Sequence, residues 1–371
     1  AQGVSGRVAE PMAGKKKAGA AAAAATEPRG PPRKPGAGLP SWALVPAAGC
    51  LAAALIYRRA TAAGGAEPQP PSPPPPREQD APAPTAKLPK LPPARLWVPA
   101  GKDLSGAPLR RGVRCVRRKS DAEANSCMPT EGCSRHVIDG LASPQEVQVL
   151  RDLLEWLVAE AWGGGAGPPS VVDLHQGSIS YKDNFVLLHK LMEFKKVNFT
   201  SEQVDVYNAV RDRVGDRVKE LFGAPDILPE MSFFSHINAS KDARNLHDEY
   251  WHPHIDTEQY GTFAVTTILY LNGFGSDYQG GAFRFADDTA AAREALGGPR
   301  GGNWSSVEPT AGRLVTFTSG RENVHHVEAV SQGVRLALTM AFTCSKAKAS
   351  SVLRWEGGGG SGLSEAEQEQ G

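Results

Sequence analysis

The densest group of side chains able to bind a metal is a short stretch that ends in His254, Ile255 and Asp256. A histidine and an aspartate at i and i+2 project from the same side of a strand, so both can reach one ion. Two histidines and one carboxylate on one face of an octahedron are typical of non-haem iron(II) oxygenases, whose other coordination positions stay open. The sequence therefore predicts that His254 and Asp256, on or beside a strand, bind iron(II) with a histidine from a distant strand.

Two adjacent histidines are candidates for that third ligand. His325 lies 69 residues after Asp256, and His326 follows it directly. A shift of one residue in strand register would exchange the side chain that points to the metal. Residue type and spacing alone leave both open.

Arg335 follows His325 by ten residues, at the start of a strongly β-prone segment. The planar fork of arginine binds a carboxylate through two parallel hydrogen bonds, which suits the distal carboxylate of 2-oxoglutarate. Tyr270 and Thr339 are the hydroxyl groups expected beside it, and Thr339 shares a strand face with Arg335. These residues predict a co-substrate site next to the metal.

The elements expected to position these residues are helices followed by strands. Ser143, Pro144 and Glu146 are typical of a helix start, and that helix is expected to run to about Trp162. A second helix is expected over 201–222, closed by Gly223. After Pro229 come short apolar segments typical of strands, and 287–303 reads as a loop insertion. Helices followed by closely spaced strands predict an α+β fold with a β-sandwich or barrel core. The expected strands are 231–238, 263–272, 281–286, 312–318, 325–330 and 335–343.

Residues 231–344 resemble the prolyl-4-hydroxylase type of 2-oxoglutarate/iron(II) oxygenase. The motifs that carry the resemblance are H-I-D at 254–256, I-L-Y-L-N at 268–272, G-G at 280–281, H-x-V at 325–327 and R-x-x-x-T at 335–339. A wider similarity to a single-pass membrane member of the family extends from about Cys115 to Cys344. It is carried by DLHQGSISYKDNFVLLHKL at 173–191 and HDEYWHPHID at 247–256.

The resemblance implies a double-stranded β-helix (jelly-roll) fold that uses iron(II), 2-oxoglutarate, dioxygen and L-ascorbate. It also implies roles by matched position, and its H-x-V motif favours His325 over His326. The implied reaction converts 2-oxoglutarate to succinate while hydroxylating a protein or peptide side chain, prolyl by analogy. The implied iron ligands are His254, Asp256 and His325, and the implied 2-oxoglutarate contacts are Arg335, Tyr270 and Thr339.

Cysteines and glycosylation sequons point to an oxidising compartment. Outside residues 41–57 the chain has four cysteines, an even number that predicts two disulfides with three possible pairings. Three N-x-[ST] sequons mark possible glycosylation sites. The cysteines are Cys115, Cys127, Cys133 and Cys344, and the sequon asparagines are Asn198, Asn238 and Asn303.

The chain before the catalytic region predicts a membrane anchor and a spacer. Residues 41–57 carry no charge, and seven Lys or Arg precede them. This favours a single-pass type II protein whose catalytic part lies in the lumen of the endoplasmic reticulum or Golgi. Residues 61–100 contain 13 prolines, which favour an extended spacer. The expected parts are a disordered basic cytoplasmic tail (1–40), the anchor (41–57), a Pro-rich stalk (58–112), a Cys-bearing helical support (113–230), the oxygenase core (231–346) and a disordered tail (347–371), with the folded part starting at about Cys115.

Other functions fit the sequence less well. A net charge of +1 without a dense basic face argues against nucleic acid as a partner. A catalytically silent, membrane-anchored jelly-roll binding module is the main alternative, but it would need neither the complete ligand set nor Arg335. A cupin-type enzyme that uses a metal such as manganese would not need Arg335 and Tyr270.

Overall fold

The computed structural model describes residues 95–105, 107–116, 122, 125–160, 164–195, 198–245, 248–288, 291–292, 302–350 and 355–357. All of them belong to one compact unit. The expected cytoplasmic tail (1–40) and membrane anchor (41–57) lie outside these residues. Among the described residues, no helix combines the length and apolar character needed to cross a membrane.

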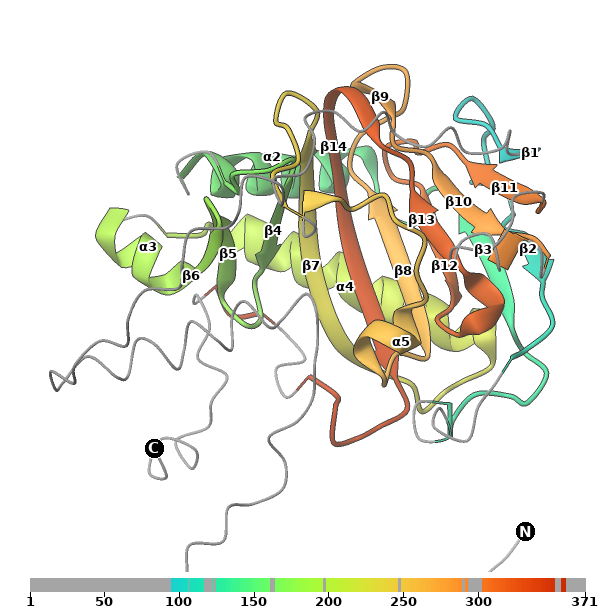
Figure 1. Cartoon of the computed structure of the whole chain (residues 1–371). Coiled ribbons are helices and arrows are strands. Elements are labelled where there is room, and N and C mark those ends of the chain that lie inside the picture. The colour runs from blue at the N-terminus through green and yellow to red at the C-terminus, as the bar shows by residue number, and fades with distance from the viewer. Residues whose placement is uncertain are drawn as a thin grey trace, which may run out of the picture. The chain divides into compact units, whose positions relative to one another are not determined.

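Two sheets and several helices form the structure (Figure 1). The larger sheet has the order β2-β3-β12-β8-β14-β7-β4-β5-β6, with β9 paired to β14, and the smaller has the order β1-β11-β10-β13. The strands of the larger sheet are β2 (Leu109–Gly112), β3 (Ser134–Ile138), β12 (Leu314–Thr318), β8 (Val265–Tyr270), β14 (Val330–Thr343), β7 (Leu228–Asn238), β4 (Pro169–Asp173), β5 (Ser178–Tyr181), β6 (Asn184–Leu187) and β9 (Tyr278–Gly280). Those of the smaller sheet are β1 (Arg95–Val98), β11 (Trp304–Val307), β10 (Phe283–Ala286) and β13 (His325–Val327). The helices are α2 (Pro144–Glu160), α3 (Leu188–Lys195), α4 (Ser201–Phe222), α5 (Asp256–Tyr260) and the 3-10 turn η3 (Arg321–Asn323).

The central strands of the larger sheet are buried on both faces, and their side chains alternate between two cores. On one face, Leu269 of β8 and Leu338 of β14 pack in a core with α2 and α4, which lie behind the sheet in Figure 1. On the other face, Tyr270 and Ala337 pack in a second core with Phe283 of the smaller sheet. Two sheets that enclose a side-chain-filled interior, with the long helices outside, form the double-stranded β-helix that the family resemblance implies.

The two long helices begin and end where the sequence predicts. At α2, the Ser143 N–H donates to Glu146 Oε2 (2.8 Å) and the Glu146 N–H donates to Ser143 Oγ (3.2 Å), which is a reciprocal capping box. α4 has the same arrangement between Thr200 and Gln203. It ends at Gly223, whose φ of +60° is a left-handed conformation that glycine adopts without strain. These caps fix where α2 begins and where α4 begins and ends.

The folded part starts earlier and ends later than the sequence predicts. β1 and β2 fall within the range expected to be stalk, yet β1 pairs in parallel with β11 and β2 pairs with β3. The expectation that folding starts at about Cys115 is therefore wrong. At the other end, Trp355 is 2% exposed, and its backbone N–H donates to Asn208 Oδ1 (2.7 Å) of α4. Part of the expected disordered tail is therefore anchored to a helix.

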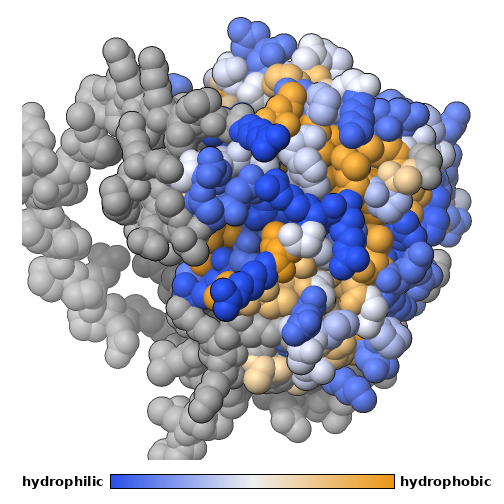
Figure 2. All heavy atoms as spheres, turned by 90° about the vertical axis from the view of Figure 1, so that its right-hand side faces the viewer, coloured by the Kyte–Doolittle hydropathy of each residue, from blue (hydrophilic) through white to orange (hydrophobic). Residues whose placement is uncertain are grey.

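The face on the side of β1, β2 and β11 mixes surface types. Figure 2 shows hydrophobic patches there, separated by hydrophilic side chains. Leu96 of β1 and Val116 are large apolar residues that are about half exposed. Single exposed apolar residues of this kind are ordinary on a folded surface.

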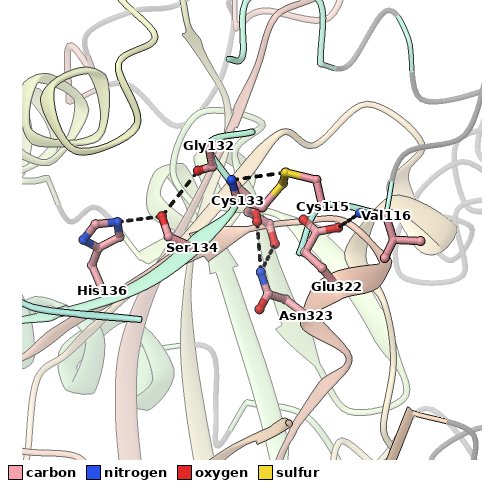
Figure 3. Close-up of a disulfide and its surroundings, with 9 residues drawn as sticks. Cys115, Val116, Gly132, Cys133, Ser134, His136, Glu322 and Asn323 are labelled. Atoms are coloured by element: carbon pink, nitrogen blue, oxygen red, sulfur yellow. Dashed lines mark hydrogen bonds between the residues drawn. A yellow bond between two sulfur atoms is a disulfide. The ribbon is translucent and has the colours of Figure 1, made fainter. Parts of the chain in front are cut away.

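Two disulfides are present, as predicted, and they settle the pairing. Cys115 bonds Cys133, and Cys127 bonds Cys344. Beside the first bond, the Val116 N–H donates to a Glu322 carboxylate oxygen of η3 at 3.3 Å (Figure 3). The Cys115–Cys133 disulfide therefore lies next to the turn that leads into His325.

The second disulfide is expected to stabilise the fold more than the first. In the chain-entropy description, a disulfide stabilises by constraining the unfolded chain, and the gain grows with loop length. The separations are 18 residues for Cys115–Cys133 and 217 residues for Cys127–Cys344. Replacing both cysteines of the first pair by serine should lower the free energy of unfolding by about 3 kcal/mol, and of the second by about 5 kcal/mol. Chemical denaturation of the two double variants measures this, and a larger loss from the first pair would contradict it.

Candidate metal centre

His254, Asp256 and His325 converge on one point, although they are far apart in the chain. Asp256 Oδ1 lies 3.7 Å from His254 Nε2 and 3.5 Å from His325 Nε2. One ligand atom from each residue lies within 4.8 Å of the others, in a group able to hold a metal ion. Asp256 and His325 are buried and His254 is partly exposed, so the point is reached from one side.

The convergence does not come from strand alternation, which corrects the expected placement of the H-x-D motif. His254 forms an isolated antiparallel bridge with His325, in which each N–H donates to the other's carbonyl at 2.9 and 3.1 Å. Ile255 is extended, and Asp256 is the first residue of α5. The bridge and the turn into α5 together bring the carboxylate between the two imidazoles.

Both imidazoles are oriented by backbone carbonyls. His254 Nδ1 lies 2.9 Å from the His252 carbonyl oxygen, and His325 Nδ1 lies 2.8 Å from that of Asn323. A carbonyl only accepts, so each Nδ1 carries the proton and each Nε2 presents a lone pair. This tautomer is the one in which Nε2 binds a metal while Nδ1–H holds the ring in place.

The structure brings His325 and not His326 to the carboxylate. In the pairing of β10 with β13, Phe285 faces His325 and Arg284 faces His326, so the two histidines point to opposite faces. The His325 ring lies 4.7 Å from that of Phe317, in the interior between the sheets. The His326 ring instead packs on Trp304, 5.0 Å away. Burial lowers the pKa of His325 to about 4 and that of His326 to about 3, so both are neutral at pH 7.

The Asp256 carboxylate is held by a hydroxyl pair. Thr266 Oγ1 donates to Asp256 Oδ2 at 2.6 Å and lies 2.7 Å from Ser319 Oγ. Oδ2 is thereby occupied, while Oδ1 faces both histidines. The two hydroxyls fix which carboxylate oxygen is free to bind a metal.

Removal of the Thr266 hydroxyl should weaken metal binding. Thr266→Val keeps the shape and leaves Oδ2 without its donor, and loss of such a supporting residue lowers metal affinity about 10- to 100-fold. The matched control is Thr267→Val, because the Thr267 hydroxyl is also buried but donates to the Met340 carbonyl (3.1 Å) on the helix side of β8. Titration with Co(II) compares them, and equal affinities in the two variants would refute the role of Thr266.

Arg335, Tyr270 and Thr339 lie on the interior face of the larger sheet. In the register of β14 with β8, Tyr270 pairs with Ala337 and Thr339 pairs with Ile268. Arg335 is two residues before Ala337, so it shares their face. The Arg335 Cζ lies 5.1 Å from the centre of the Tyr270 ring. The predicted co-substrate residues are therefore neighbours.

Arg335 is buried with hydrogen-bonding capacity unused, which fits a carboxylate ligand. It is 2% exposed, and its Nε and Nη2 have no hydrogen-bond partner in the described structure, nor does the Tyr270 hydroxyl. A buried cation without a partner is costly unless an anion occupies the site. The pair of free N–H groups matches the two oxygens of a carboxylate such as the distal one of 2-oxoglutarate.

Tyr278 belongs to the same site and was not predicted. Its hydroxyl is also buried and has no hydrogen-bond partner among the described residues. Burial raises the pKa of its phenol, and the charge of Arg335 partly offsets this. Gly281 packs directly against these two side chains, and a Cβ there would lie 3.0 Å from both Arg335 Cδ and Tyr278 Cε2. Its φ of +69° also favours glycine at this position. The only signal in the sequence was the adjacent G-G motif.

The three sequon asparagines lie at different depths. Asn198 and Asn303 are exposed, and Asn238 at the end of β7 is partly buried. The Asn238 Oδ1 accepts hydrogen bonds from the N–H (2.9 Å) and hydroxyl (2.8 Å) of Ser240. Two of the three side chains are therefore accessible on the folded surface.

Known proteins resemble this chain over the same region. Residues 242–343 match the family described as the 2OG-Fe(II) oxygenase superfamily. The chain is 37% identical over 234 residues to 2-oxoglutarate and iron-dependent oxygenase domain-containing protein 3 of Xenopus tropicalis, a match covering 62% of this chain and 68% of that protein. It is 29% identical over 256 residues to prolyl 3-hydroxylase 1 of Gallus gallus, covering 63% and 32%. A crystal structure of a Pseudomonas putida prolyl-4-hydroxylase aligns with a TM-score of 0.36 and 19% identity, covering 60% and 97%.

The family match includes the residues on which the site depends. His254, Asp256, His325 and Arg335 all fall within residues 242–343. The structure places the first three together and gives Arg335 a buried position suited to a carboxylate. Sequence, fold and site thus agree, and the chain belongs to the 2-oxoglutarate and iron(II)-dependent oxygenases.

Proposed function

We propose that this oxygenase hydroxylates a protein or peptide side chain, with iron(II) held by His254, Asp256 and His325. The observation that carries the proposal is the combination of this triad with the buried Arg335, whose Nε and Nη2 have no hydrogen-bond partner among the described residues. The two lie on a shared interior, because the His325 ring contacts Phe283 (5.1 Å), and Phe283 packs in one core with Tyr270. A metal ligand set and a carboxylate site on one interior are what a 2-oxoglutarate oxygenase requires.

The residues divide the work between binding and shielding. Iron(II) and 2-oxoglutarate, when bound, would together activate dioxygen, which supplies the oxygen atom inserted into a C–H bond. Arg335 binds the distal carboxylate through its free N–H groups, and we assign hydroxyl contacts to Tyr270 and Thr339. Thr339 is half-buried on the Arg335 face. Phe283 and Phe317 pack against the His325 ring and exclude water from that side.

Prolyl hydroxylation is the reaction we favour. Support comes from prolyl 3-hydroxylase 1, to which the chain is 29% identical over 256 residues. We also propose that L-ascorbate keeps the iron in its ferrous state, as the family resemblance implies. Analysis of hydroxylated peptides by mass spectrometry identifies the modified residue, and modification at a residue other than proline would refute the prolyl assignment.

We further propose that the catalytic part lies in the secretory lumen, held there by residues 41–57. The two disulfides support an oxidising compartment. The exposed Asn198 and Asn303 support accessible glycosylation sites. Enzymatic removal of N-glycans from the chain expressed in cells should lower its mass, and an unchanged mass together with a cytosolic signal would refute this location.

The activity is tested by turnover of 2-oxoglutarate without an added substrate. The purified full-length chain should convert 2-oxoglutarate slowly to succinate in the presence of iron(II), oxygen and ascorbate. His254→Ala should abolish this conversion, because only two ligands remain. Absence of turnover and of iron binding under anaerobic conditions in the parental chain would overturn the proposal and favour a silent binding module.

A further inference from the structure

Arg135 is a buried arginine that connects β3 to the region around His325. It is 1% exposed, and it uses each arm of its guanidinium group. Nε donates to Asn323 Oδ1 at 2.6 Å, Nη2 donates to the Ala286 carbonyl at 2.6 Å, and Nη1 donates to Asp287 Oδ1 at 2.7 Å. Two segments, residues 286–287 and the turn at Asn323, are thereby fixed to one side chain of β3.

Asn323 transmits this contact directly to His325. Its Oδ1 accepts from Arg135, and its Nδ2 donates to the Thr318 carbonyl (2.8 Å) and Oγ1 (2.9 Å). Its backbone carbonyl is the acceptor for His325 Nδ1. Figure 3 shows Asn323 next to Glu322 and close to the disulfide. The residue that orients the imidazole is therefore itself held at both ends of its side-chain amide.

A second route reaches Val324, the residue directly before His325, and the strand beside His325. Arg135 binds the Ala286 carbonyl, and the Ala286 N–H donates to the Val324 carbonyl at 2.9 Å. The guanidinium lies 4.3 Å from the centre of the Phe285 ring, and Phe285 is the strand partner of His325. The arginine therefore restrains both the residues before His325 and the strand beside it.

A buried apolar residue could occupy the position of Arg135 with a smaller desolvation penalty. Desolvation of a buried cation is expensive, and apolar residues of similar volume often give equal or greater stability. Burial lowers the pKa of Arg135 to about 10, even with the Asp287 carboxylate beside it. Its hydrogen bonds converge on the segments next to His325, which suggests that the buried arginine is retained to hold those segments in place.

We propose that Arg135 is a positioning residue for the iron(II) centre, acting through Asn323 to fix the orientation of the His325 imidazole. The inference rests on the proposed role of His325 as a ligand. His254 is oriented differently, because its Nδ1 bonds the carbonyl of the exposed His252 in its own loop. Loss of the arginine should therefore affect the metal site through His325.

The test is Co(II) binding to the full-length chain, followed by visible absorption. Arg135→Lys keeps the charge but cannot reach three acceptors, so affinity should fall about 10- to 100-fold, with a changed Co(II) spectrum. The matched control is Arg313→Lys. Arg313 is 0% exposed and binds Asp139 (2.9 Å) and the carbonyls of Pro99 and Glu308 (both 3.0 Å), none of which contacts the triad. This control should lose stability and keep Co(II) affinity.

Two results would overturn this inference and leave the proposed iron site standing. One is a Co(II) affinity of Arg135→Lys equal to that of the parental chain, and the other is an equal loss of Co(II) affinity in Arg135→Lys and Arg313→Lys. If Arg135→Lys does not fold by circular dichroism, Asn323→Ala decides, because it keeps the backbone carbonyl and removes the side chain that anchors it. Weakened binding in Asn323→Ala supports the inference, and parental affinity overturns it. Failure of the parental chain to bind Co(II) would instead overturn the proposed iron site, and this inference with it.

Discussion

Replacing His325 by alanine is expected to abolish metal binding and the conversion of 2-oxoglutarate to succinate. His325 Nε2 lies 3.5 Å from Asp256 Oδ1, and removal of the ring leaves one histidine and one carboxylate. The loss of metal affinity should exceed about 100-fold, the upper range for removing a residue that only supports a ligand. Isothermal titration with Co(II) and a succinate assay measure both effects.

His326→Ala is the matched control for this prediction. His326 is adjacent, 0% exposed and packed on Trp304 on the opposite face of the smaller sheet. Its loss should lower the melting temperature, because a buried ring is removed, and leave Co(II) affinity unchanged. If His326→Ala abolished metal binding while His325→Ala did not, the assignment of the third ligand would be wrong.

Replacing Arg335 by glutamine is expected to raise the KM for 2-oxoglutarate about 100-fold, because each hydrogen bond to a charged group contributes about 1.5–3 kcal/mol. The variant removes the positive charge of Arg335 and its Nε and Nη2 donors, which lie between the two sheets. The His254, Asp256 and His325 triad stays intact. Co(II) binding without 2-oxoglutarate should therefore stay at the parental level. Initial rates of succinate formation at varied 2-oxoglutarate give the KM.

Arg284→Gln is the control for Arg335. Arg284 is mostly buried on β10 and forms an ion pair with Glu328, so its carboxylate partner is already part of the protein. This variant should leave the KM for 2-oxoglutarate unchanged. A similar rise in KM in both variants, or none in Arg335→Gln, would remove Arg335 from the co-substrate site.

The features of the fold and of the site that could be predicted are those encoded by residues close together in the sequence. The caps of α2 and α4 are encoded within a few residues, so their bounds were predictable. The spacing of His254, Asp256 and Arg335 was also recognisable from sequence. The expectation that strand alternation brings His254 and Asp256 together was wrong, because Asp256 is the first residue of α5 and His254 is held by a bridge to His325, 71 positions away.

The missed elements depend on distant partners. β3 is buried at all five positions and shows no alternation, so nothing marked Arg135 as part of a sheet. β11, with the sequence WSSV, pairs with β1 more than 200 residues earlier. Tyr278 reaches Arg335 only because β9 pairs with β14. Such contacts are set by sheet topology, which one sequence does not display.

The position of β14 constrains how this chain can fold during synthesis. β14 is the last strand among the described residues, yet it lies between β7 and β8 in the larger sheet. Until it emerges from the ribosome, both neighbours present open edges, which are prone to intermolecular pairing. Cys115 can find Cys133 early, but Cys127 must wait for Cys344. A nascent or truncated chain without β14 therefore has no completed sheet and no Arg335, so catalytic competence arises only after β14 has been synthesised and inserted.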